Sequence, residues 1–135
     1  MFVFYGDVYM SIRVAVRSIL EDLMNKLRDE VVGCAVSTMD GFIISSAALP
    51  SISSRLSSEK LSELGEITSK IFHEIEEVEG AKTRSIAIRG SNGYILSIAV
   101  DDALLLILTS ENPNLGLILD EIRAVGGKLK EILGY

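Results

Sequence analysis

Apolar residues in this chain follow two spacings, which are the repeat of an amphipathic helix and the repeat of a strand. The helical spacing of three and four residues covers segments 11–27, 58–79 and 113–133. Strand-like runs cover segments 31–38, 42–47, 83–89, 94–100 and 103–109. The order α-β-β-α-β-β-β-α predicts a mixed α/β (α+β) domain built on a five-stranded antiparallel sheet.

The turns and strand patterns indicate how this sheet is laid out. Asp40-Gly41 joins two β-branched runs and predicts a type I′ hairpin turn, because both residues tolerate a positive φ. Segment 103–109 contains an unbroken apolar run, so we expect it at the centre of the sheet with both faces buried. Segment 83–89 alternates instead, with Ile86 and Ile88 on one side, which is typical of an edge strand.

Capping residues, a serine-rich segment and a glycine pair indicate where the helices end or are interrupted. Ser58 is a suitable N-cap for helix 58–79, and Gly80 is suited to a left-handed end. The serine-rich segment 48–57 predicts a poorly ordered loop. Gly126-Gly127 predicts an interruption of the last helix.

The number of helices does not suffice to cover both faces of this sheet. Five strands about 4.8 Å apart form a sheet roughly 20 Å wide, and a helix with its side chains is about 10 Å across. Helices 11–27 and 113–133 can cover one face together. Helix 58–79 covers only half of the other face, so a second copy of the chain is the economical source of the missing cover.

Helix 58–79 has the apolar surface that such an arrangement needs. Its apolar arc spans roughly 160°, whereas packing on one side needs about 100°. Edge strand 83–89 can pair with its counterpart across a two-fold axis, which would also protect the edge. The predicted dimer interface comprises Gly65, Ile67, Thr68, Ile71, Phe72, Ile75, Arg84, Ser85, Ile86, Ala87 and Ile88.

Composition narrows the class of protein. A length of 135 residues suits one domain, and a mean hydropathy of +0.36 suggests surface that a partner covers. The net charge of −6 argues against nucleic acid as a partner, since the basic footprint is missing. The single cysteine excludes an intramolecular disulfide and fits a reducing compartment, so we expect the cytoplasm.

The N-terminal segment lies outside the helical pattern that begins at Ser11. Residues 1–9 are apolar without the basic start of a signal peptide. We expect residues 1–10 to be an extension of a single domain at 11–135, or alternatively a docked strand. The longest apolar run elsewhere, 103–108, is too short to span a membrane.

Residues suited to catalysis or metal binding are scarce. The only histidine, His73, lies off the apolar stripe of its helix, and Cys34 lies among small apolar residues in a strand. A structural zinc site needs several such ligands together. The sequence therefore predicts no enzyme and no cofactor.

The order and spacing of three segments resemble the Roadblock (Roadblock/dynein light chain) family, in particular its stand-alone prokaryotic members. These segments are 27–46 with the Asp40-Gly41 turn, 86–96 with Ser91-Asn92-Gly93, and 104–109. The resemblance implies helices 11–27 and 113–133 on one face of the sheet and helix 58–79 on the other. It also implies homodimers formed through helix 58–79 and the third strand, which regulate or scaffold small Ras-like GTPases.

Two hypotheses for function follow. The first is a noncatalytic homodimeric module that binds a small GTPase, with candidate partner-binding residues Arg55, Glu63, Glu66, Lys70 and Arg89. The alternative is a small-molecule sensor whose pocket would be lined by Phe42, Tyr94 and segment 48–57.

Overall fold

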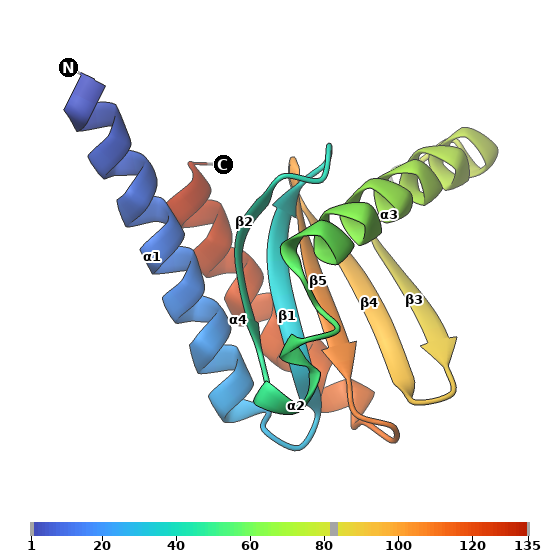
Figure 1. Cartoon of the computed structure of the whole chain (residues 1–135). Helices are drawn as coiled ribbons and strands as arrows, with labels where there is room; N and C mark the ends of the chain where they lie inside the picture. The colour runs from blue at the N-terminus through green and yellow to red at the C-terminus, as the bar shows by residue number, and fades with distance from the viewer. Residues whose placement is uncertain (1, 82–83, 135) are drawn as a thin grey trace.

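Helices and strands follow one another along residues 2–81 and 84–134, the part of the chain that the computed structural model describes; side chains are described from Ser11 onward. The elements are α1 (Phe2–Lys26), β1 (Val31–Thr38), β2 (Ile43–Ala48), α2 (Pro50–Ser53), α3 (Ser58–Glu79), β3 (Ser85–Gly90), β4 (Gly93–Val100), β5 (Ala103–Thr109) and α4 (Leu115–Leu133). Figure 1 shows α1 and α4 on one face of the sheet and α3 on the other, as predicted.

The five strands form one antiparallel sheet in the order β2-β1-β5-β4-β3. The central position of β5 and the edge position of β3 are both confirmed. In β5, the residues from Ala103 to Ile107 are buried, whereas β3 is exposed along almost its whole length. The sheet therefore has a dry centre and one open edge.

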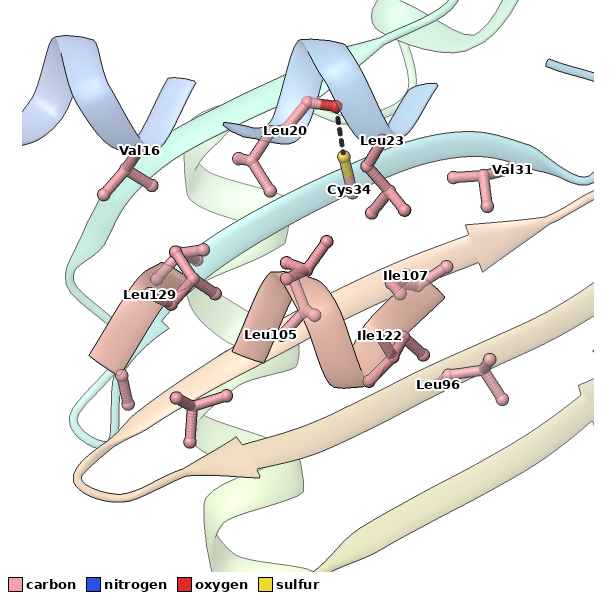
Figure 2. Packing of buried hydrophobic residues seen from close by; sticks show 14 of the residues in the cluster. Val16, Leu20, Leu23, Val31, Cys34, Leu96, Leu105, Ile107, Ile122 and Leu129 are labelled. Carbon is pink, nitrogen blue, oxygen red and sulfur yellow. Dashed lines mark hydrogen bonds between the residues drawn. The ribbon is translucent and has the colours of Figure 1, made fainter. Parts of the chain in front are cut away.

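The main hydrophobic core lies between the sheet and the helix pair α1–α4. Figure 2 shows Leu20 and Leu23 of α1 beside Cys34 of β1, and Leu129 of α4 near Leu105 of β5. A second, smaller cluster lies beneath α3 and consists of Ala35, Leu61 and Leu106, with partly buried apolar neighbours. α3 thus covers its face of the sheet far less completely than α1 and α4 cover theirs.

The predicted start of the first helix at Ser11 is wrong. α1 begins at Phe2, so residues 2–10 are helical and do not form a docked strand. The apolar spacing of Ile12 and Val16 continues backwards through Tyr9 and Tyr5 without a proline, so nothing in this segment stops the helix. None of the helices in the described part of the chain is long and apolar enough to cross a bilayer.

The turn between β1 and β2 is longer than the predicted type I′ turn. Gly41 has a φ of 90°, but Asp40 does not have a positive φ. Thr38 donates its N–H to the Phe42 carbonyl (2.9 Å), and its own carbonyl accepts from Gly41 N–H (3.1 Å). This is a three-residue loop with glycine in the left-handed position. The Thr38 hydroxyl favours it by donating to the Asp40 carboxylate and accepting from Phe42 N–H.

Three smaller expectations also need correction. Segment 48–57 is not simply a loop, since Pro50 begins the one-turn helix α2, where proline is compatible with the first helical position. The N-cap of α3 is Ser57, whose hydroxyl accepts from Lys60 N–H (3.1 Å). α4 continues through Gly126-Gly127, because Val125 and Leu129 keep its buried stripe in place on either side.

Candidate functional site

α3 is seated on its own sheet through a narrow stripe of four buried residues: Leu61, Gly65, Thr68 and Phe72. Gly65 allows a close approach, because a Cβ there would lie 3.0 Å from Ser37 Oγ. The Thr68 hydroxyl donates to the Leu64 carbonyl (2.8 Å) within the helix. Three residues of the predicted dimer interface, Gly65, Thr68 and Phe72, therefore lie against the chain's own sheet.

A second apolar stripe on α3 is covered only in part by its own sheet. It lies about a quarter turn around the helix from the buried stripe and comprises Leu64, Ile67, Ile71, Ile75 and Val78. Ile67 is 53% exposed and Val78 is 87% exposed. We call these five residues the free stripe of α3. A helix that packs on a single sheet in a monomer needs only one apolar stripe, so this second stripe indicates contact with a partner.

The two edges of the sheet are protected very differently. α1 packs along β2 at one edge, and Arg13 Nε donates to the Ile44 carbonyl (3.0 Å). β3 at the other edge has no such cover from the described residues, and Arg84, Ser85 and Ala87 are exposed. An open strand edge of this kind is a template for pairing with another strand.

The predicted edge residues lie on both faces of β3. Ile86 pairs with Ser97 and Ile88 with Ile95, which places both isoleucines on the α3 face. Ile88 is 43% exposed. Ser85, Ala87 and Arg89 lie on the opposite face by alternation. The α3 face of β3 therefore continues the apolar surface of the free stripe.

An open groove of about 570 Å³ lies on the α3 face at the end of the sheet where β3 finishes and β4 begins. Its apolar lining includes Ile52, Leu56, Leu64, Ile88, Ile95 and Leu108. Among the described residues that line it, the charged ones are Arg55 and Lys60, both cations. We call this feature the β3-end groove.

Charge on α3 is concentrated at the opposite end from these cations. Four of its last six residues are glutamates, Glu74, Glu76, Glu77 and Glu79, and its last turn contains no basic residue. The C-terminus of a helix carries a partial negative charge, so this arrangement is unfavourable unless a cation compensates for it. His73 lies near one of them, with Nε2 3.1 Å from Glu77 Oε1.

The five candidate partner-binding residues do not form one cluster. Arg55 lines the β3-end groove, and Glu63 pairs with Lys60 at its rim (3.0 Å). Glu66 and Lys70 lie around another side of α3, in a shallow hollow that also contains Met39. Arg89 lies over the Tyr94 ring, 5.8 Å from its centroid. They provide separate charged points rather than a single site.

Cys34 and His73, the two residues that the sequence offered for chemistry, lie on different elements, β1 and α3. Burial raises the pKa of the Cys34 thiol to about 12, and its Sγ contacts the Leu20 carbonyl oxygen at 3.7 Å (Figure 2). His73 is exposed on α3. In residues 2–81 and 84–134, no group of three or more histidine, cysteine, aspartate or glutamate side chains is placed to hold a metal ion.

The sequence missed the β3-end groove because its lining comes from distant segments. Ile52 and Leu56 are four residues apart, a spacing that indicates a helical turn facing the sheet, but the serines around them favoured the prediction of a loop. Both side chains pack over Gly33, where an added Cβ would lie 2.8 Å from Leu56 Cδ1. Phe42 and Tyr94, expected to line one pocket, line two separate grooves.

Comparison with known proteins gives no match to a family model and none to a curated protein. The fold does match solved structures. A Roadblock/LC7 domain from Streptomyces avermitilis aligns with a TM-score of 0.74 at 10% identity, over 88% of this chain and 98% of the other. The chain has the Roadblock/LC7 fold. Myxococcus xanthus MglB aligns with a TM-score of 0.76 at 14% identity, over 90% of each chain.

The Roadblock/LC7 fold agrees with the resemblance drawn from the sequence. The gliding protein MglB from Thermus thermophilus aligns at a TM-score of 0.73 and 14% identity, again over 90% of each chain. Profilin IB from Acanthamoeba castellanii also aligns, at a TM-score of 0.61 and 12% identity, over 88% of this chain and 98% of the profilin. Since a fold hosts different functions, function must be argued from the surface of this chain.

Proposed function

We propose that this protein is a noncatalytic homodimeric module that binds a small Ras-like GTPase and regulates or scaffolds it. The observation that carries the proposal is the open edge of β3 beside the free stripe of α3. Within the described residues of the protomer, the edge of β3 has no partner strand and the free stripe of α3 is only partly covered, and the two lie next to each other. A two-fold axis at β3 would give the strand edge a partner strand and cover the free stripe of α3 in the same dimer.

In this dimer the predicted interface residues have two roles. Ile67, Ile71 and Ile75 contact the other copy along the free stripe, and residues 84–88 pair with their counterparts. Gly65, Thr68 and Phe72 hold α3 in place against its own sheet. One solved MglB structure is described as having a tetrameric arrangement, which supports self-association on this fold.

The GTPase part of the proposal is supported by the likeness to Roadblock/LC7 and MglB structures. On this chain, Arg55, Glu63, Glu66, Lys70 and Arg89 remain the candidate contacts. Arg55, Arg84 and Arg89 are exposed and are the arginines to test for a role in stabilising phosphate charge. The domain itself is proposed to span residues 11–135, in the cytoplasm, where a free Cys34 stays reduced.

Calorimetric titration with a small Ras-like GTPase from the same genome tests this function. The GTPase is loaded with GDP in one experiment and with a non-hydrolysable GTP analogue in the other. We expect the dimer to bind one form at least about tenfold more tightly, a coupling of about 1.4 kcal/mol. Absent binding contradicts the GTPase proposal, and equal affinity for the two forms contradicts regulation.

The β3-end groove favours one alternative function, the sensing of a small molecule. Its volume of about 570 Å³ is within the usual range of ligand sites. A panel of apolar metabolites with an anionic group, screened by thermal unfolding, would reveal such a ligand as a rise in Tm. A flat response across the panel would exclude the compounds tested and leave the groove to a protein partner.

A further inference from the structure

We infer that the β3-end groove of each copy is the seat for the C-terminal half of α3 from the other copy, whose terminal glutamates meet Arg55 and Lys60. The inference rests on the proposed homodimer and assigns one segment and one charge pattern to it. It specifies what fills the groove, which is open in the protomer.

The groove selects an occupant that is apolar and acidic. Its walls are aliphatic, from Ile52 and Leu56 on one side to Ile88 and Ile95 on the other. The charged side chains that line it, within the described residues, are cationic. Arg55 is exposed. Lys60 can still pair with a carboxylate of the occupant, since its ion pair with Glu63 is exposed and therefore weak.

The C-terminal half of α3 has this same combination of properties. Ile75 and Val78 continue the free stripe to the end of the helix, and Val78 is 87% exposed. Glu74 precedes Val78 by four residues and Glu79 follows Ile75 by four, so the two carboxylates flank the apolar pair. Their position at a helix C-terminus is unfavourable in the isolated protomer, and the cations of a partner would relieve it.

The topology brings these two features together across a two-fold axis. The segment between Glu79 and Ser85 is short, so α3 ends near the start of β3. The groove lies at the other end of β3, beside Ile88 and Gly90. Antiparallel pairing of β3 with its counterpart sets the start of one strand beside the end of the other. The end of α3 in one copy therefore reaches the groove of its partner, on the same face of the sheet.

A charge-swap experiment on the full chain tests the inference. The groove variant is Arg55→Glu with Lys60→Glu, and the helix variant is Glu74→Lys with Glu79→Lys. The groove variant places negative charge near the N-terminus of α3 and the helix variant places positive charge near its C-terminus. Both changes interact favourably with the helix dipole, so neither is expected to unfold α3. The control, Arg28→Glu with Lys128→Glu, makes the same change in net charge as the groove variant at exposed positions away from α3.

Sedimentation velocity gives the dimer dissociation constant for each protein and for the equimolar mixture. Like charges face each other in both junctions of each variant homodimer, so we expect its Kd to rise at least about tenfold. In the mixture every junction pairs opposite charges, so the heterodimer should form with a Kd near that of the wild type. The control should dimerise as the wild type does.

The outcomes separate this inference from the function it rests on. A wild-type chain that stays monomeric refutes the proposed homodimer itself. A dimeric wild type with unchanged variants, or a mixture that recovers no dimer, refutes the seating of α3 in the groove and leaves the dimer standing.

Discussion

The contact between Gly65 and Ser37 makes a sharp prediction about how α3 is held on the sheet. Glycine in a helix interior is less favourable than alanine by about 1 kcal/mol. Gly65→Ala would gain that amount, but its Cβ would lie 3.0 Å from Ser37 Oγ. Overpacking of this kind costs about 1–3 kcal/mol. We therefore expect Gly65→Ala in the wild type to change the free energy of unfolding by between zero and a loss of about 2 kcal/mol.

Removing the Ser37 hydroxyl should reverse this result. Without Oγ, the nearest atoms to the new methyl are Gly41 Cα at 3.5 Å and Ser37 Cβ at 3.6 Å, which are ordinary van der Waals contacts. The hydroxyl has no hydrogen-bond partner in the described residues, so Ser37→Ala alone should be neutral or stabilising by about 1 kcal/mol. In the Ser37→Ala background, Gly65→Ala should then stabilise by about 1 kcal/mol.

Urea unfolding followed by circular dichroism, at one fixed protein concentration, measures the four stabilities of this double-mutant cycle. A fixed concentration is needed because dimerisation itself contributes to stability. The expected coupling energy is about 1–3 kcal/mol, the steric term alone. An equal effect of Gly65→Ala in both backgrounds would show that α3 does not approach the sheet at Ser37.

Two further predictions concern the β3–β4 turn and the core. Gly93→Ala should lower the free energy of unfolding by at least about 2–3 kcal/mol, because φ is 133° and a Cβ would lie 2.5 Å from the Thr109 carbonyl oxygen. The control Gly80→Ala, at a positive φ with open space around it, should lower it by only about 1–2 kcal/mol in the same urea assay. Equal losses for the two variants would contradict the close approach at Gly93. Cys34 should resist a thiol reagent at pH 8 until urea unfolds the chain. Since folding raises its pKa from 9.0 to about 12, its contribution to stability should be complete below pH 9 and decline as the pH rises towards 12; a Cys34→Ala variant with the same decline would contradict this.

Much of the fold could be predicted because its signals are local. The run at 103–109 marks a central strand in the sequence itself, since a short element with an unbroken apolar run has both faces buried. Gly80 ends α3 as expected, with a φ of 72°. The turn at Asp40-Gly41 could not be predicted in detail, because the Thr38 side chain, two residues upstream, favours the longer loop.

The candidate site could be predicted only in part, because it depends on how α3 is rotated over the sheet. The sequence shows a wide apolar arc but not which half of it is used internally. Gly65 and Ser37 decide that, by letting one stripe approach the sheet and leaving Ile67 and Ile71 free. The β3-end groove could not be predicted from the sequence, since Ile52, Ile88 and Leu108 come together only in the folded chain.

The most direct test of the central claim is the absolute mass of the protein in solution, by light scattering after size exclusion at low micromolar concentration. We predict twice the chain mass of 14.7 kDa for the wild type. For Ile71→Glu with Ile88→Glu, which places charges on the free stripe and on the β3 edge, we predict the mass of a single chain. A monomeric wild type, or a variant that keeps the doubled mass, would contradict a dimer formed through α3 and β3.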